Sequence, residues 1–327
     1  MLREKPEFAP DPELLKIDSM LHVLITKNHF LRCHEAALYG VRPSSVNQLA
    51  QVRDGDAAYL YQRVAGALYG PYCCRGPVRY LGPTVPAPVW EAAAPGSARE
   101  KFRFVVRLEA AGEVCRFSIS QFYEAAQEAA VELVPADFVK RSVYTFLPGD
   151  GVRFADALAR VPRQVAMPFL PQPRPYPVKG CVPLCGKHLG FILKYERLDE
   201  SLLEFVLARE ETALAREMQA RPAFNQLRID DRGNRIDLVY ASREALFIIE
   251  LKRGCRDAEA RRDIIRYEIW ARGRRERLAA ALGLGEVRPT VAPVLVAAGG
   301  PHRPADCRIY DWQLLKNPVR LAFTRVQ

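Results

Sequence analysis

Two carboxylates and a lysine lie on neighbouring predicted strands in the C-terminal half of the chain. Residues 236–241 and 245–252 each have the apolar, β-branched composition of a strand, and a short turn separates them. Because side chains alternate between the two faces of a strand, Glu250 and Lys252 point to the same side. Asp237 stands among apolar residues in the first strand. Buried charges of this kind need charged partners or a metal ion.

Metal-assisted hydrolysis of phosphodiesters is the chemistry that uses this set of residues. Two carboxylates, here Asp237 and Glu250, can bind a hard cation such as Mg²⁺, which keeps water molecules for the substrate and the nucleophile. A neighbouring lysine, here Lys252, can orient the attacking water or stabilise charge on the phosphate. The alternative is a hairpin in which Glu250 and Lys252 form a surface ion pair without a catalytic role.

The string RIDLVYASREALFIIELKRG, residues 235–254, resembles the signature of PD-(D/E)XK nucleases. It is most similar to the RecB-like catalytic domain of the NucS endonuclease family, in which an "IDL" strand is followed by a "VIE-x-K-R" strand. The similarity extends over residues 198–298. The resemblance implies DNA as the substrate, Mg²⁺ or Mn²⁺ as the cofactor, and catalytic roles for Asp237, Glu250 and Lys252.

A third carboxylate is expected from the predicted helix over residues 198–218. Glu204 stands in the segment LLEFVL, with apolar residues on both sides. This segment resembles the "L-E-x-x-L" motif of NucS-like nucleases, which implies that Glu204 completes or supports the metal site. Glu200, one turn earlier on the helix, is the alternative. A solvated helix glutamate outside the site is the other interpretation.

The charge of the chain favours a polyanionic partner such as nucleic acid, because 48 Lys and Arg outnumber 38 Asp and Glu and leave a net charge of +10. An arginine-rich helix is predicted over residues 257–282, and its composition fits either a solvated face or a DNA-binding track. NucS-like relatives carry "Q-x-x-R-Y" on this helix. Here Asp263 replaces the Gln, and an aspartate at this position could still bind a water of the metal ion. The candidate nucleic-acid contacts are Arg235, Arg253, Arg256, Arg266 and Tyr267.

The N-terminal half is rich in predicted strands with short helices and frequent turns, a pattern that suits a small barrel-like sheet. It resembles the PUA-like superfamily, particularly the EVE, YTH and plant development-and-cell-death domains. The segments that carry this weaker resemblance are residues 22–25, 36–41 (AALYGV), 53–56 (RDGD), 59–61, 68–71 (LYGP) and 104–108.

The PUA-like resemblance implies binding of nucleic acid, in some relatives through a pocket for a flipped or modified base. Such a pocket uses aromatic stacking. The alternative is that these aromatic side chains form the core of the small barrel. The candidates for the base pocket are Tyr39, Tyr59, Tyr61 and Trp90.

These patterns predict an α+β protein of two domains. After an N-terminal arm over residues 1–18, a PUA-like small β-barrel with short helices is expected over residues 19–160. A proline-rich linker follows over residues 161–195, where a solvated spacer is one interpretation and a track for phosphates the other. Residues 196–327 are expected to form an α/β, restriction-endonuclease-like mixed sheet flanked by helices.

The predicted function is that of a Mg²⁺- or Mn²⁺-dependent DNA endonuclease in restriction or repair. Its N-terminal domain would select the DNA by a modified base, a mismatch, or a branched or single-stranded structure. The alternative is a non-catalytic or RNA-directed nucleic-acid-binding protein. Because cutting both strands at once needs two active sites, we take a homodimer as a hypothesis. We find no convincing sliding-clamp motif and no apolar run of about 18 residues, and we expect a cytoplasmic protein without a membrane partner.

Overall fold

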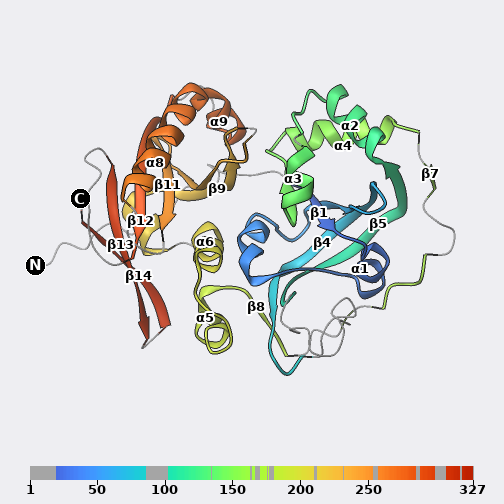
Figure 1. Cartoon of the computed structure of the whole chain (residues 1–327), viewed down its shortest axis with the longest axis horizontal. Helices are drawn as coiled ribbons and strands as arrows, with labels where there is room; N and C mark the ends of the chain where they lie inside the picture. Colours follow the sequence, from blue (N-terminus) through green and yellow to red (C-terminus); the bar gives the residue numbers. More distant parts are fainter. Residues whose placement is uncertain are drawn as a thin grey trace, which may run out of the picture.

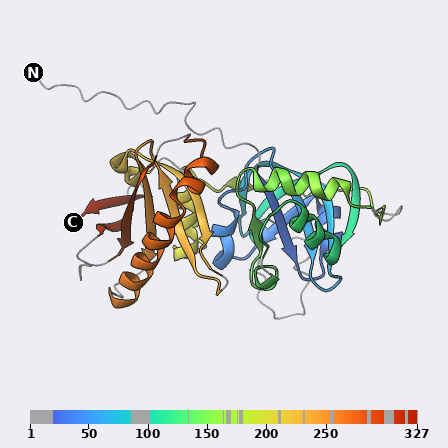
Figure 2. The same ribbon diagram turned by 90° about the horizontal axis from the view of Figure 1, so that it is seen from above.

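The computed structural model of the chain has an α+β architecture with two β-sheets side by side (Figure 1). Helix α6 (Glu200–Arg209) runs between them (Figure 1), and the view from above shows the same two halves side by side (Figure 2). The structure describes residues 20–85, 102–133, 135–162, 164–165, 170–174, 176, 180–209, 212–230, 232–252, 257–284, 288–298, 307–316 and 319–326.

The first sheet is strongly curled and belongs to the N-terminal half. Its strand order is β2-β5-β4-β3-β1-β6, with β7 paired to β5 and β8 paired to β4. Only the β1–β3 pair among these described strands is parallel. The strands are β1 (Leu21–Thr26), β2 (Leu38–Val41), β3 (Ala57–Gln62), β4 (Ala67–Leu81), β5 (Phe104–Ser118), β6 (Val143–Thr145), β7 (Gln164–Val165) and β8 (Cys181–Pro183).

Short helices cover the ends and one side of this sheet. Ser118 begins α2 with a capping box, because its hydroxyl accepts from the Gln121 amide and the Gln121 side chain accepts from the Ser118 backbone N–H. Gly151 lets α4 approach β1 closely, since a Cβ at this position would lie 2.8 Å from the Cβ of Leu21. The helices are α1 (Phe30–Ala36), the 3₁₀ helix η1 (Pro43–Leu49), α2 (Ile119–Glu128), α3 (Pro135–Lys140) and α4 (Asp150–Arg160).

The second sheet is mixed and has the order β14-β13-β12-β11-β10-β9. Strands β9, β10 and β11 form an antiparallel meander, and helix α8 then crosses over to β12, which runs parallel to β11. Its strands are β9 (Arg221–Arg228), β10 (Arg235–Ala241), β11 (Ala245–Lys252), β12 (Thr290–Ala297), β13 (Arg308–Lys316) and β14 (Val319–Arg325). The associated helices are α5 (Gly186–Ile192), α7 (Ala213–Met218), α8 (Asp257–Gly273) and α9 (Arg275–Ala281).

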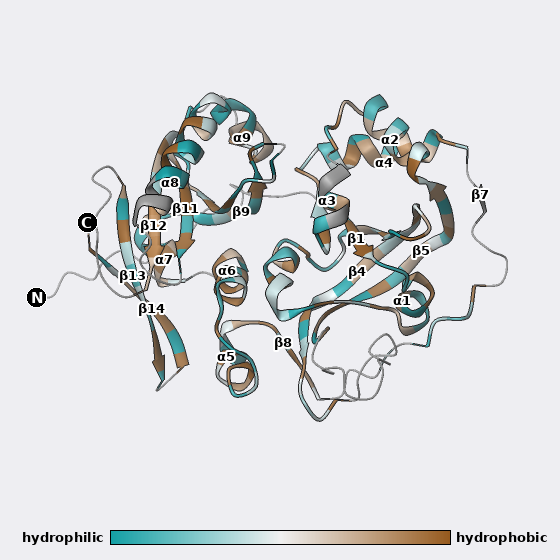
Figure 3. Cartoon of the chain, viewed as in Figure 1, coloured by the Kyte–Doolittle hydropathy of each residue, from teal (hydrophilic) through white to brown (hydrophobic). Residues whose placement is uncertain are grey.

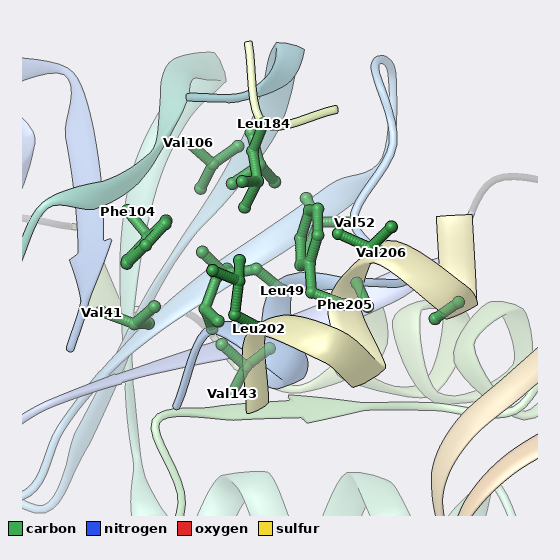
Figure 4. Packing of buried hydrophobic residues seen from close by; sticks show 14 of the residues in the cluster. Val41, Leu49, Val52, Phe104, Val106, Val143, Leu184, Leu202, Phe205 and Val206 are labelled. Atoms are coloured by element: carbon green, nitrogen blue, oxygen red, sulfur yellow. The ribbon is translucent and has the colours of Figure 1, made fainter. Parts of the chain in front are cut away.

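Helix α6 joins the two halves through one shared hydrophobic core. Every residue from Leu202 to Ala208 is buried, and all of them except Glu204 are apolar, so the helix is covered on all sides. Figure 4 shows Leu202, Phe205 and Val206 packed among side chains of the first sheet and its η1 region. The same core cluster continues into the second sheet through strands β10, β11 and β12. The two sheets are therefore held together by packing as well as by the chain connection.

The two faces of the second sheet have different partners. Leu238, Ile249 and Leu251 face the core that contains α6, whereas Val239 and Ile248 face a second cluster with α8 and α9. Figure 3 shows hydrophilic segments alternating with hydrophobic ones along α8, as expected of a helix that covers one face of a sheet. No helix in the described ranges is long and apolar enough to span a membrane.

Several predicted elements differ from those in the structure. The helix expected over residues 257–282 breaks at Arg274 into α8 and α9, and the helix expected over 198–218 divides into α6 and α7. Part of the predicted linker is folded, because β8 pairs with β4 and α5 follows it. The pairing partner of β8 is distant in the sequence, so the proline-rich composition of this segment did not reveal the pairing. The predicted N-terminal arm lies outside the described residues.

Candidate active site beside helix α6

Asp237 and Glu250 face each other across two neighbouring strands. The β10–β11 register ends with the pair Leu238–Ile249, and Asp237 and Glu250 are the next residues on the two strands. The charge of Asp237 acts on Glu250, so the two carboxyl groups lie close together. Directly opposed residues share one face of the sheet. One oxygen of Asp237, Oδ2, accepts a hydrogen bond from the backbone N–H of Leu251 at 2.8 Å. The meander thus holds both carboxylates side by side, as a shared cation would require.

Lys252 completes this cluster from the end of β11. Its ammonium group donates to Oε1 of Glu250 and lies 3.9 Å from Oδ2 of Asp263 on α8. Glu250 is only 3% exposed. Its second oxygen, Oε2, is buried without a hydrogen-bond partner among the described residues. A buried carboxylate oxygen without a donor is costly, and it indicates that a further positive or donating group belongs there.

Glu204 reaches the same region from α6 but is held by side-chain amides. Asn47 and Gln226 donate to its Oε2 at 2.7 and 3.0 Å, and Asn225 donates to its Oε1 at 3.2 Å. The amide of Gln226 also donates to Oδ1 of Asp237 at 3.3 Å, so it bridges the two carboxylates. Gln226 has a positive φ of 53° within β9, a conformation that few residues other than glycine adopt.

Asn47 of η1 ties the first half of the chain to this cluster with both its side chain and its backbone. Its side-chain amide donates to Glu204, and its Oδ1 accepts from the hydroxyl of Ser201 at 2.9 Å. Its backbone N–H donates to the same hydroxyl at 3.2 Å, and its carbonyl accepts from Asn225 at 2.6 Å. A residue of the N-terminal half therefore positions the helix carboxylate of the C-terminal half.

The carboxyl groups of this cluster have raised pKa values. Burial is the largest cause for Asp237, whose pKa is raised to about 6, and the carboxylate of Glu200 adds to it against the Leu251 N–H. Burial and the neighbouring Asp237 raise the pKa of Glu250 to about 9. The same two causes raise the pKa of Glu204 well above its usual range, against its amide donors. Crowded, buried carboxyl groups resist ionisation unless a cation joins them.

The two helix glutamates have different surroundings. The two oxygens of Glu204 accept hydrogen bonds from three side-chain amides. Glu200, one turn earlier, is close enough for its charge to raise the pKa of both Asp237 and Lys252. Burial lowers the pKa of Lys252, but Glu250 and the other carboxylates outweigh it. Both helix carboxylates therefore interact with Asp237 by charge, and Glu204 is also linked to it through the amide of Gln226.

The donor set fits a hard divalent cation. Within the described ranges, no three His, Cys, Asp or Glu side chains are gathered closely enough to surround one ion. Mg²⁺, however, is usually bound through one or two carboxylates and keeps several waters or substrate oxygens. Asp237 and Glu250 offer such a pair, and the unpartnered Oε2 of Glu250 provides a ligand atom that no other described group uses.

Of the predicted nucleic-acid contacts, the described ones are engaged within the protein. Arg235 donates to Asp137 of α3 and to the carbonyl of Gly233, so it bridges the two halves of the chain. Arg266 donates to Asp263 at 2.7 Å and lies over the ring of Tyr267, which is 5% exposed. Arg253 and Arg256 lie outside the described residues.

The predicted base pocket is not assembled. Tyr39 is buried in one core cluster and its hydroxyl donates to the carbonyl of Ile25, while Tyr59 and Tyr61 belong to the other cluster of the first sheet. None of the three is more than 9% exposed. Tyr59 and Tyr61 pack in the cluster that includes helices α2, α3 and α4, whereas Tyr39 lies in the other cluster, which favours the alternative that these tyrosines form the core. Trp90 lies outside the described residues.

A polar cleft between the two halves was missed by the sequence analysis. It has a volume of about 420 Å³ and lies beside the amides of Asn225 and Gln226. Its walls come from segments that are far apart in the sequence, so no local sequence motif predicts the cleft. The charged and aromatic residues that line it include Asp137, Arg141, Tyr144, Asp150, Arg228, Trp270, Arg274 and Arg277.

Comparisons with known proteins do not assign the chain to a family. No protein-family model matches it, and no curated protein does. Among solved structures, the chain is similar to a crystal structure of the Mmi1 YTH domain in complex with RNA, at 13% sequence identity. The match covers 46% of this chain and 83% of that chain, with a TM-score of 0.27. At this TM-score the likeness is partial, and the function must be argued from the contacts of the site.

Proposed function

We propose that this protein is a metal-dependent endonuclease that hydrolyses phosphodiester bonds in DNA. The observation that carries the proposal is the pairing of Asp237 with Glu250 on adjacent strands, with Lys252 beside them and one oxygen of Glu250 left without a partner among the described residues. The order of α6, three antiparallel strands, α8 and a parallel strand also fits the α/β core that such a nuclease needs. The net charge of +10 suits a polyanionic substrate.

Asp237 and Glu250 would hold Mg²⁺ or Mn²⁺. When bound, the ion would polarise the scissile phosphate and lower the pKa of a coordinated water. Leu251 orients Asp237 through its backbone N–H, and the Gln226 amide restrains the other oxygen. Lys252 would stabilise negative charge that develops on the phosphate, or orient the attacking water. Asp263 is placed to hold the ammonium group of Lys252 on the α8 side of the site.

Cleavage of a panel of DNA substrates tests this proposal. Single-stranded, duplex, mismatched, branched and methylated DNA would be incubated with wild-type protein in Mg²⁺, in Mn²⁺ and in chelator, and the same panel with Lys252→Ala. We expect cleavage of at least one substrate that depends on the metal and falls by about a hundredfold in the variant. If wild type and Lys252→Ala cleave every substrate at the same, barely detectable rate, the enzyme proposal is wrong. Nucleic-acid binding without catalysis would then be favoured.

The same panel addresses the selectivity attributed to the N-terminal half. Equal rates on methylated and unmodified DNA would exclude selection of methylated bases. An RNA competitor that displaces DNA would favour an RNA-directed role.

Sedimentation with and without DNA tests the homodimer, because a monomeric mass in both conditions contradicts it.

Glu200 lies on α6 and not on the strands, but we expect it to increase the affinity of the site for the metal ion. Its charge acts on both Asp237 and Lys252, and residues that support metal ligands affect affinity by about tenfold or more. We therefore expect Glu200→Gln to raise the Mg²⁺ concentration for half-maximal cleavage by about tenfold while the maximal rate changes less. A metal titration of the cleavage rate measures this. Arg197→Gln, just before α6, is the control, and an equal shift in both variants would argue against the role.

A further inference from the structure

The polar cleft between the two halves has the size of a small-ligand site. Its volume of about 420 Å³ falls within the range of pockets that hold small organic molecules. One wall comes from η1, α3 and β6 of the first half, and the other from β9, α8 and α9 of the second. Because both halves line it, a ligand in this cleft would contact each of them.

Arg141 is the residue in this cleft that most needs a ligand. Its guanidinium group makes no hydrogen bond or ion pair with any described residue, although its side chain is partly buried. Burial, followed by the nearby charge of Arg235, lowers its pKa to about 10. Buried guanidinium groups are ordinarily paired with carboxylates or phosphates in a bidentate manner. An arginine held here without such a pair is suited to receive an anion.

Asp137, the carboxylate with the largest effect on Arg141, already pairs with two other arginines. Asp137 accepts from Arg235, and its other oxygen lies 3.5 Å from the guanidinium group of Arg228. Glu204 also acts on Arg141 by its charge, but its oxygens accept hydrogen bonds from side-chain amides, so Arg141 has no carboxylate of its own among the described residues. Elsewhere in the lining, Asp150 pairs with Arg153 and lies 3.6 Å from Arg277, so the charges of these residues are already matched.

Aromatic and amide groups of the cleft are suited to a base. Trp270 lines the cleft, and the guanidinium group of Arg274 lies 4.9 Å from its ring centre. Gln48 is oriented by two backbone donors, Ser142 and Val143, to its Oε1. Gln48 lines the cleft, and no described residue accepts a hydrogen bond from its amide nitrogen. Side-chain amides and aromatic rings of this kind recognise a base by hydrogen bonding and stacking.

We propose that this cleft binds one nucleotide of the DNA strand, with its phosphate on Arg141 and its base beside Trp270 and Gln48. The inference deepens the proposed function and rests on it for the choice of nucleic acid as the ligand. The cleft leads to the candidate active site, because Gln226 both lines it and donates to Asp237 and Glu204. A volume of about 420 Å³ holds a nucleotide extruded from the stack or drawn from a single strand, not a duplex.

Binding without metal tests this proposal separately from cleavage. Fluorescence anisotropy with a labelled single-stranded oligonucleotide would be measured in chelator across a range of salt concentrations. We expect Arg141→Gln to weaken binding by about tenfold or more and to reduce the salt slope by about one phosphate contact. Arg141→Lys, which keeps the charge but loses the planar fork, should recover part of the affinity.

Arg160→Gln is the matched control. Arg160 lies at the other end of α4 from Asp150, roughly 15 Å along the helix, and pairs with Glu128 at the surface. The control variant loses the same charge but should retain wild-type affinity. Thermal unfolding with a mononucleotide checks the fold of Arg141→Gln: the nucleotide should raise the Tm of wild type and leave that of the folded variant unchanged.

The outcomes separate the two proposals. Wild-type affinity and salt slope in a folded Arg141→Gln variant would overturn the cleft site. Weakened binding in that variant, together with absence of metal-dependent cleavage by wild type, would keep the cleft as a nucleic-acid site and remove the endonuclease. If Arg160→Gln weakens oligonucleotide binding as much as Arg141→Gln does, the loss reflects only the lower net charge. That result would also overturn the assignment of the phosphate to Arg141.

Discussion

Asp237→Asn is expected to reduce metal-dependent DNA cleavage by at least about a hundredfold. The variant removes the negative charge of one of the two paired carboxylates, and with it most of the attraction for a divalent cation. The fold should be kept, because an asparagine oxygen can still accept the hydrogen bond from the Leu251 N–H. Cleavage of the preferred DNA substrate at saturating Mg²⁺ measures the loss.

Although Asp237→Asn should lose cleavage activity, its folding stability without metal should increase relative to wild type. Asp237 has a pKa raised to about 6, so its ionisation opposes folding. The protonated form contributes its full stability below the usual pKa of an aspartate, and that contribution is lost as the pH rises through about 6. The asparagine side chain of the variant cannot ionise, and the variant should therefore gain stability relative to wild type as the pH rises from about 4 to 7.

Urea unfolding in chelator at several pH values measures this gain. Asp156→Asn is the control, since Asp156 is exposed on α4 and its substitution should alter neither cleavage nor the pH profile. A variant that loses activity together with stability would indicate a structural aspartate. Lost cleavage with unchanged or increased stability is the result that the proposed metal site requires.

Asn47→Ala is expected to lower the free energy of unfolding by about 2–4 kcal/mol. The substitution removes the donor to Glu204 and the acceptor for Ser201, and it leaves a buried carboxyl group short of one partner. A hydrogen bond to a charged group contributes about 1.5–3 kcal/mol, and one between neutral groups about 0.5–1.5 kcal/mol. Cleavage should also decrease, because Gln226 would have to restrain Glu204 with one amide fewer.

Chemical denaturation of Asn47→Ala beside Asn28→Ala measures the difference. Asn28 is exposed at the end of β1, and its replacement should change the free energy of unfolding by less than about 0.5 kcal/mol. Similar losses in both variants would show that the contact between η1 and α6 contributes little. A loss confined to Asn47→Ala would establish that the N-terminal half supports the candidate active site.

The local elements of the site could be predicted from the sequence. Residues 245–252 form β11 with the predicted bounds, and alternation along it correctly places Glu250 and Lys252 on one face. This succeeds because the strand period of two depends only on neighbouring residues. The meander of β10 and β11 follows from the short turn between them, and it brings Asp237 opposite Glu250.

Only the tertiary structure decided what surrounds these residues. The amides that hold Glu204 come from η1 and β9, and the cleft joins Arg141 to Trp270 from distant parts of the sequence. The tyrosines expected in a base pocket are buried in two different clusters, because the core covers one side of the first sheet and helices α2, α3 and α4 contribute to the cluster that holds Tyr59 and Tyr61. Sequence patterns report which face of an element is apolar, but long-range packing determines which partner covers it. For this chain, the pattern determined the carboxylates and the lysine, and the packing of two sheets against α6 determined the environment in which they act.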